Sequence, residues 1–247
     1  MASLARGLAV LRAFSQQRPH QSISQISVRT EIPRAAVRRA LHTLTRLGYV
    51  GHDPDRRTFT LRPKVLSLGY AYLSSIPMVT LAQPVLDALS DKLHESSSMA
   101  VLEADEVVYV ARSKTTRRLM AVDLNVGSRL PAYCTSLGRV LLAAMPPEEL
   151  KQYLARVQPV RYTQHTVTSR EHLRSVIENV RKDGFSIVDE ELEIGLRSIA
   201  VPILDSRGTI CSAMNASSQA SRLPLVEFRR TFLPALRQAA SELNIHE

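Results

Sequence analysis

The sequence predicts an α+β protein in which a small winged helix-turn-helix precedes a helical linker and a larger domain. Three observations lead to this prediction. Arginine is concentrated in residues 1–62, and helix and hairpin patterns follow one another there in the order of a winged helix. From residue 99 on, short strand patterns are grouped with helices between them, which is typical of an antiparallel sheet covered by helices. With 247 residues, 45% of them hydrophobic, the chain can form two buried cores.

Charge is distributed unevenly along the chain. Residues 1–62 contain eleven arginines, no lysine and three acidic residues, a net +8 of the total charge of +9. A basic module beside a nearly neutral body indicates a polyanionic partner for the module alone. Arginine suits DNA because its planar guanidinium forms paired hydrogen bonds with phosphate and guanine. The alternative is a merely solvated basic surface, so charge alone leaves nucleic-acid binding open.

The N-terminal module begins with an amphipathic helix over residues 3–17, which is expected to end near Pro19 and whose apolar face comprises Leu4, Leu8, Leu11 and Phe14. A short helix follows over residues 23–30. The turn after it is unusual, because Glu31 stands where such turns often have glycine. A left-handed backbone at this residue costs on the order of 1 kcal/mol, which good packing of the turn can offset.

The second helix of the motif starts at Pro33, a residue favoured in the first turn of a helix, and Gly48 ends it. A hairpin over residues 49–61 follows. The buried face of the helix is expected to comprise Val37, Leu41, Leu44 and Leu47. Helix, short helix, tight turn, basic helix and basic hairpin together make a winged helix-turn-helix.

Such a helix fits the major groove of DNA, with the residues near its N-terminus facing the base edges. Either Ala35 or Ala36 is positioned to pack on a thymine methyl group. Winged helices also serve as protein–protein modules, but the arginines on the helix and the hairpin favour double-stranded DNA. The expected DNA contacts are Ser22, Arg34, Ala35, Arg38, Arg39, His42, Arg56 and Arg57.

Two apolar helices follow the hairpin, one from residue 63 to before Pro77 and one over 79–93. They either pack on the chain's own body or pair with a second chain. Proteins that read DNA grooves commonly dimerise, which favours a homodimer. The predicted domains are residues 1–62 for DNA binding, 63–76 for the linker helix and 77–247 for the C-terminal domain.

The C-terminal domain alternates strand and helix patterns. Strands are expected over residues 99–102, 107–111, 118–124, 185–188, 199–204 and 209–215. Helices are expected over residues 135–145, 147–157, 170–182 and 225–243. The order predicts a sensor-like α+β domain.

An enzymatic function is the weaker interpretation. Ser136 precedes Leu137-Gly138, but a nucleophile elbow needs glycine two residues before the serine, where Cys134 stands. Cys134 lacks a recognisable base, and the seven histidines show no metal-binding spacing. The acidic residues between 189 and 193 are more typical of a solvated loop than of a metal site.

A binding site is easier to support. Thr135 or Ser136 caps a helix whose free N–H groups and dipole attract an anion. A carboxylate held there against an apolar wall is one interpretation, and a plain N-cap is equally compatible with these residues.

The segments SLARGLAVLRAF, PRAAVRRALHTLTRLGYV and VLSLGYAYLSS resemble the DNA-binding half of the IclR family of bacterial transcriptional regulators. GSRLPAYCTSLGRVLLA and GFSIVDEELEIGLRSIAVPILDSRG resemble the signatures of its effector domain, so the likeness covers essentially the whole chain. EVVYVARS, LGYAYLSS and LPAYCTSLGRVLL are most similar to the branch that includes the protocatechuate and 4-hydroxybenzoate regulators of the β-ketoadipate pathway.

This resemblance implies a GAF-like effector domain, a homodimer that often pairs into tetramers, and transcription switched by a small organic acid, here an aromatic acid. A short aliphatic acid is the alternative. Arg112 and Arg129 either pair with the acid's carboxylate or serve on the surface. Neither a cofactor nor a metal is implied. The effector contacts carried over are Thr135, Ser136, Leu137, Asp189, Glu190, Ser198, Asn215 and Ser217.

Other features bound the remaining alternatives. The apolar runs are too short for a membrane span, and two cysteines give no disulfide framework, so a cytoplasmic protein without a membrane partner is expected. Two further classes stay open. One is an enzyme for a small carboxylate with a protein-docking winged helix, and the other is a metal-responsive regulator that uses Cys134, Cys211 and the acidic residues.

Overall fold

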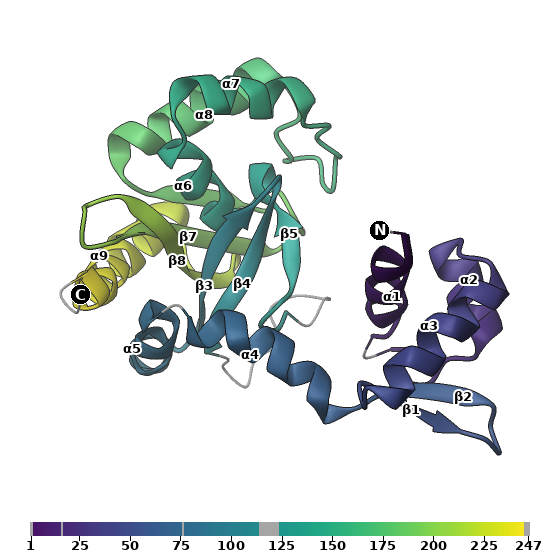
Figure 1. The fold of residues 1–247 in the computed structure, drawn as a ribbon. Helices are drawn as coiled ribbons and strands as arrows, with labels where there is room; N and C mark the ends of the chain where they lie inside the picture. Colours follow the sequence, from purple (N-terminus) through teal and green to yellow (C-terminus); the bar gives the residue numbers. More distant parts are fainter. Residues whose placement is uncertain (1, 16, 76, 114–123, 245–247) are drawn as a thin grey trace. The chain divides into compact units, whose positions relative to one another are not determined.

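The computed structural model describes residues 2–15, 17–75, 77–113 and 124–244 (Figure 1). The chain divides into two compact units, residues 1–75 and 76–247. Each unit has a hydrophobic core of its own. The α+β class and the N-terminal winged helix-turn-helix predicted from the sequence are confirmed.

The first unit consists of three helices, a two-stranded antiparallel hairpin and the start of the linker. Its core lies between α1, α3 and the hairpin, around the fully buried side chains of Val10, Ile26, Val37 and Leu41. The elements are α1 (Ala2–Arg12), α2 (Ile23–Thr30), α3 (Arg34–Arg46), β1 (Val50–Asp53), β2 (Thr58–Leu61), the 3₁₀ helix η1 (Pro63–Val65) and α4 (Leu66–Ser74).

Left-handed residues follow α2 and α3 where the sequence predicts the ends of these two helices. Glu31 follows α2 with φ +57°, the strained conformation expected for that turn, and Gly48 follows α3 with φ +80°. The Ser27 hydroxyl donates to the Ile32 carbonyl at 2.6 Å and helps to hold the turn.

The apolar face of α1 differs from the prediction. The helix ends at Arg12 rather than at residue 17, and Leu4 and Leu8 are 73% and 50% exposed. The core takes Val10 instead, because α1 packs on α3 through that face. Ala36 is also buried, so the expectation that it can pack on a thymine methyl is wrong, whereas Ala35 is exposed.

The second unit is a three-layer structure around a six-stranded antiparallel sheet of order β5-β4-β3-β8-β7-β6. Helices α5 and α9 cover one face, and α6, backed by α8, covers the other (Figure 1). The elements are α5 (Pro77–Leu93), β3 (Ser96–Glu103), β4 (Glu106–Ser113), β5 (Arg129–Pro131), η2 (Ala132–Cys134), α6 (Ser136–Ala144), α7 (Pro147–Arg156), α8 (Arg170–Asp183), β6 (Ser186–Asp189), β7 (Leu196–Leu204), β8 (Ile210–Gln219) and α9 (Leu225–Asn244).

The second unit has one strand that the sequence does not predict, and one predicted strand falls almost entirely on residues that are not described. The strand predicted over residues 118–124 lies outside the described residues, apart from Leu124. Strand β5 is not predicted by the sequence, because three residues that include a proline are too short for an alternating pattern. It pairs with β4 at one edge of the sheet.

Among the described residues, none of the helices is by itself long and apolar enough to cross a bilayer.

Candidate functional site

The first unit presents an exposed basic surface on α3. The helix buries Val37 and Leu41, which turns the side chains between them toward solvent. Arg34, Ala35, Arg38, Arg39 and His42 are all exposed, as the DNA-contact prediction requires. Ser22 lies at the start of α2, where its hydroxyl accepts from Gln25 N at 3.3 Å and forms a capping box.

The hairpin tip adds two more exposed arginines, Arg56 and Arg57. Its turn is held by Asp53, whose Oδ1 accepts from the backbone N–H groups of Asp55 and Arg56, each at 3.0 Å. The hydrogen bond from Arg56 N–H is the largest of the effects on the pKa of Asp53, which lies below its usual value. The tip is therefore a fixed, basic loop at neutral pH.

The start of the linker is attached to the end of the recognition helix. Lys64 Nζ donates to the Leu47 carbonyl at 2.9 Å and lies 5.2 Å from the centre of the Tyr49 ring. Arg62 N–H donates to the Tyr49 carbonyl at 2.8 Å. Two hydrogen bonds thus join the start of the linker to the segment that directly follows α3.

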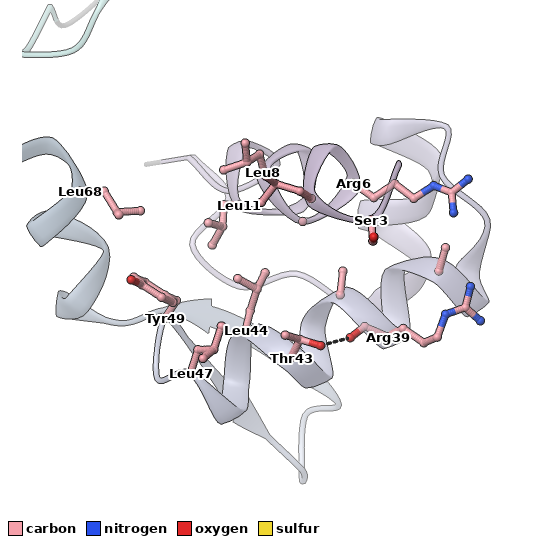
Figure 2. A pocket seen from close by; sticks show the side chains of 14 residues that line it. Ser3, Arg6, Leu8, Leu11, Arg39, Thr43, Leu44, Leu47, Tyr49 and Leu68 are labelled. Atoms are coloured by element: carbon pink, nitrogen blue, oxygen red, sulfur yellow. Dashed lines mark hydrogen bonds between the residues drawn. The ribbon is translucent and has the colours of Figure 1, made fainter. Parts of the chain in front are cut away.

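An apolar groove of about 530 Å³ runs between α1, α3 and the linker of the first unit. Figure 2 shows Leu8 and Leu11 on one side of it and Leu44, Leu47 and Tyr49 on the other. Leu47 and Leu68 on its walls are 51% and 52% exposed. A groove of this kind, with leucines open to solvent, is typical of a surface that binds another protein segment.

The second unit contains a small cavity between α6 and the sheet. Its volume is about 30 Å³, close to the space of one water molecule. One wall comes from the sheet and the other from the start of α6 and the loop between β6 and β7. The lining residues are Tyr109, Arg112, Leu124, Leu130, Cys134, Thr135, Ser136, Val188, Leu192, Leu196, Ser198, Asn215 and Ser217.

The polar groups of this cavity lie in rows across neighbouring strands. Arg112 and Asn215 both pair with Ser98 of the central strand β3, and Ser198 pairs with Ser217 one row further on. One guanidinium nitrogen of Arg112 donates to the Ser98 hydroxyl at 3.0 Å. The arrangement brings a cation, hydroxyls and an amide together in a largely apolar pocket, which is suited to a small anion with a hydrophobic body.

Two of the polar atoms at the cavity are buried without a hydrogen-bond partner among the described residues. They are the hydroxyl oxygen of Ser136, a residue 1% exposed, and the amide oxygen of Asn215, a residue 5% exposed. Thr135 differs, because its hydroxyl accepts from Gly138 N and donates to the Pro131 carbonyl, each at 3.1 Å. Buried polar atoms are normally paired, so Ser136 and Asn215 are exceptions that need an explanation.

A β-bulge turns the two largest polar side chains toward this cavity. The pairing of β3 with β4 slips between Met99 and Ala100, so that Val110 has no partner in the register. Without the extra residue, Tyr109 and Arg112 would face opposite sides of the sheet. Burial raises the pKa of Tyr109 to about 12, so its phenol is neutral at physiological pH.

The structure brings some of the predicted effector contacts together and holds others elsewhere. Thr135, Ser136, Ser198, Asn215 and Ser217 line the cavity, and Arg112 rather than Arg129 supplies its cation. The lining that sequence reasoning missed comprises Tyr109 and the apolar residues Leu124, Leu130, Cys134, Val188, Leu192 and Leu196. For those of these residues that lie on strands, the face of the sheet to which the side chain points depends on the strand register, which the sequence does not give.

The other predicted contacts have protein partners. The Asp189 carboxylate pairs with Arg197 at 2.7 and 2.8 Å, and Arg129 binds Glu103 and Glu106 at the surface. Glu190 accepts from Gly195 N at 2.7 Å. Leu137 is fully buried in the core beside the cavity.

Cysteine chemistry receives no support from the geometry. Burial raises the pKa of Cys134 to about 12, so its thiol is protonated and weakly nucleophilic at neutral pH. Within the described parts of the chain, His, Cys, Asp and Glu side chains form no group of three that can hold a metal ion.

Comparison with known proteins agrees with this architecture. The model of the IclR helix-turn-helix domain matches residues 3–54, and that of the bacterial transcriptional regulator IclR C-terminal domain matches residues 70–245. The Pca regulon regulatory protein of Pseudomonas putida is 54% identical over 243 residues, which cover 98% of this chain and 83% of that protein.

Two more relatives extend the comparison. The p-hydroxybenzoate hydroxylase transcriptional activator of Acinetobacter baylyi is 36% identical over 98% of this chain and 90% of its own length. A crystal structure of an IclR homologue from Microbacterium hydrocarbonoxydans, complexed with 4-hydroxybenzoate, superposes with a TM-score of 0.86 at 26% identity, covering 98% of each chain. The chain is thus a transcriptional regulator and not an enzyme. With both family models matched in the expected order, it belongs to the IclR family.

Proposed function

We propose that this regulator binds an aromatic monocarboxylic acid in the cavity between α6 and the sheet, and that the acid changes how two winged units bind an operator. The single observation that carries the proposal is the set of polar groups around an apolar cavity, with Arg112 beside Asn215 and Ser136. Two relatives support an aromatic acid, one named for p-hydroxybenzoate hydroxylase and one crystallised with 4-hydroxybenzoate.

In this proposal the guanidinium of Arg112 pairs with the carboxylate of the acid, because hydrogen bonds between charged groups are stronger than those between neutral groups. The Ser136 hydroxyl and the Asn215 amide oxygen then bind the ring hydroxyl of the acid, and the leucines contact the ring. The cavity of about 30 Å³ is smaller than any benzoate, so binding must move the lining apart. That displacement is the source of the signal.

Residues 1–62 serve as the DNA-reading unit and residues 63–76 as the linker, with 77–247 as the effector unit. Ser22, Arg34, Ala35, Arg38, Arg39 and His42 contact bases or phosphates, and Arg56 and Arg57 contact the backbone from the hairpin tip. Support comes from the exposure of the α3 and hairpin side chains and from the net charge of +8 within residues 1–62. The bonds from Lys64 and Arg62 connect the linker to α3 and carry the displacement to it.

The regulator acts as a homodimer, formed by burying α4 of each chain in the groove of the other. Helix α4 has no buried residue, and its Leu66 and Tyr70 are 74% and 71% exposed. The same unit carries an open apolar groove, so a two-fold pairing covers both surfaces at once. Leu66→Asp combined with Tyr70→Asp is expected to halve the mass measured by light scattering, whereas the control Val226→Asp, at an equally exposed valine on α9, leaves it unchanged.

The effector proposal is tested by titrating the full chain with 4-hydroxybenzoate, 3-hydroxybenzoate, protocatechuate, β-ketoadipate and short aliphatic acids in a calorimeter. One aromatic acid is expected to bind, and at 100 times its Kd it stabilises the fold by about 2.7 kcal/mol. Arg112→Met is expected to weaken binding at least roughly tenfold through the lost charge pair. Arg129→Met is the matched control, because its partners Glu103 and Glu106 lie on the surface. Binding of aliphatic acids alone would contradict the aromatic class.

A further inference from the structure

A buried ion pair lies directly behind the effector cavity. Two nitrogens of Arg139 donate to the two carboxylate oxygens of Glu191 at 2.6 and 2.7 Å. The side chains are only 3% and 9% exposed. A buried pair of this kind loses much hydration on folding, so by itself it is weak evidence for stability.

Arg139 belongs to the same helix as the cavity residue Ser136, one turn further along α6. Its third guanidinium nitrogen, Nε, donates to the Tyr133 carbonyl at 2.9 Å. Every nitrogen of the guanidinium thus has a protein acceptor, and Glu191 balances its charge. Arg139 does not line the cavity, and Glu191 already balances its charge. It therefore does not compete with Arg112 for an anionic ligand.

Glu191 fixes two loops at once. Its second oxygen also accepts from Val167 N at 3.0 Å, and its backbone carbonyl accepts from the Thr166 hydroxyl at 2.6 Å. Thr163 donates in turn to the Glu190 carbonyl at 2.7 Å. The loop over residues 190–195 is therefore joined to the loop before α8 and, through Arg139, to α6.

The loop held by Glu191 forms one wall of the cavity. Leu192, the next residue, lines the cavity, and so do Val188 and Leu196 on the strands that the loop connects. The start of α6, with Thr135 and Ser136, forms the rest of this wall, opposite the sheet. The ion pair thus joins the two segments of this wall, the start of α6 and the loop that carries Leu192.

We propose that Arg139 and Glu191 are positioning residues of the effector site, which hold the backbone of the Leu192 loop beside α6 while the side chains that line the cavity move apart around an aromatic carboxylate. The inference rests on the proposed effector function of that cavity. A preformed wall raises affinity because the loop need not be ordered when the ligand binds. Effector affinity should accordingly depend on the pair, while the affinity of the ligand-free protein for DNA should not.

Glu191→Gln in the full chain tests the inference. The variant keeps the shape of the side chain, but it removes the charge that balances Arg139. With its amide oxygen bonded to Val167 N, its NH₂ group faces a guanidinium nitrogen that now has no acceptor there. The Kd for 4-hydroxybenzoate, measured by calorimetry, is expected to rise roughly tenfold, which corresponds to one buried hydrogen bond. The Kd for operator DNA in the absence of acid is expected to stay within about twofold.

Glu95→Gln is the matched control. Glu95 is 1% exposed, pairs with Arg222 and the Ser218 hydroxyl, and does not line the cavity. Its substitution is expected to lower Tm as Glu191→Gln does, yet leave the Kd for 4-hydroxybenzoate unchanged. An equal rise in Kd for both variants would show general loosening of the fold and would overturn the assignment.

A milder variant covers the case in which Glu191→Gln does not fold. Arg139→Lys keeps the positive charge but cannot form the paired bonds with both oxygens of Glu191, so it weakens the ion pair without removing it. A rise in effector Kd with unchanged DNA affinity supports the inference, and an unchanged effector Kd refutes it. If the unsubstituted chain binds none of the acids, the proposed function fails first and this inference with it; if it binds and the variants bind equally well, only this inference fails.

Discussion

At the scale of single residues, Gly138 decides how closely α6 approaches the segment before it. A Cβ atom at this position would lie 2.2 Å from the Ala132 carbonyl oxygen and 2.4 Å from Ala132 Cα. The close approach places Ser136 against the sheet, where its hydroxyl reaches the cavity. Glycine is thus required at residue 138 because α6 packs closely on the segment before it, and not because a turn needs a glycine there.

Gly138→Ala is expected to lower the free energy of unfolding by about 1–3 kcal/mol, because the added Cβ meets backbone atoms that cannot shift without disturbing the fold. Thermal unfolding followed by circular dichroism checks it. The control is Gly7→Ala in α1, where a Cβ meets no atom of the chain within 4 Å. That substitution is expected to be neutral or to stabilise by about 0.5–1 kcal/mol. Equal Tm values for the two variants would contradict the packing argument.

The two cysteines differ in environment, which predicts different reactivity. Cys134 is buried and burial raises its pKa to about 12, whereas Cys211 is exposed on β8. Because only the thiolate reacts, iodoacetamide at pH 8 is expected to label Cys211 well before Cys134 in the folded chain. Peptide mass spectrometry after a timed quench measures both sites. Comparable labelling rates before unfolding would show that Cys134 is not shielded.

At the scale of elements, α3 and the β1–β2 hairpin present the arginines in two different ways. Arg38 and Arg39 lie on a helix that fits the major groove, and Arg56 and Arg57 lie on a turn fixed by Asp53. A helix in the groove reaches base edges, while a loop beside it reaches phosphates. The two elements should therefore differ in how their loss changes DNA binding.

Arg56→Ala combined with Arg57→Ala is expected to weaken binding to all DNA sequences alike and to reduce the slope of log K against log salt by roughly 0.9 per lost phosphate contact. Arg38→Ala is expected to cost about 1–3 kcal/mol on the operator and much less on unrelated DNA. Fluorescence anisotropy at several salt concentrations measures both effects. Arg207→Ala, on an exposed turn of the second unit, is the control and should change neither. Full retention of operator affinity in Arg38→Ala, Arg39→Ala would refute the recognition-helix assignment.

At the scale of the whole molecule, the chain separates DNA reading from ligand binding. The two units have separate cores, and the cavity is lined only by residues of the second unit. A fragment of residues 77–247 is therefore expected to bind the aromatic acid with the Kd of the full chain and to lose DNA affinity. Calorimetry and anisotropy on the purified fragment check this. A folded fragment that no longer binds the acid would show that the first unit contributes to the site.

The sequence by itself determined what depends on neighbouring residues. The basic helix α3, the left-handed Glu31 and an N-cap at Thr135 or Ser136 follow from periodicity, charge and turn chemistry, and the structure has each of them, with Thr135 as the cap. Most strands of the second unit are predicted as well, but β5 is not. Family motifs extended this to several cavity residues, such as Ser136 and Asn215.

Only the tertiary structure decided which polar side chains meet in the cavity. Asp189 and Glu190 belong to a motif, yet Arg197 and the backbone of Gly195 occupy their carboxylates. Arg112 reaches the cavity because a single extra residue at Val110 shifts the register and reverses the direction of its side chain. The pairing partner of a strand and the position of a bulge depend on residues far away in sequence, and a one-residue shift moves a side chain to the other face of the sheet.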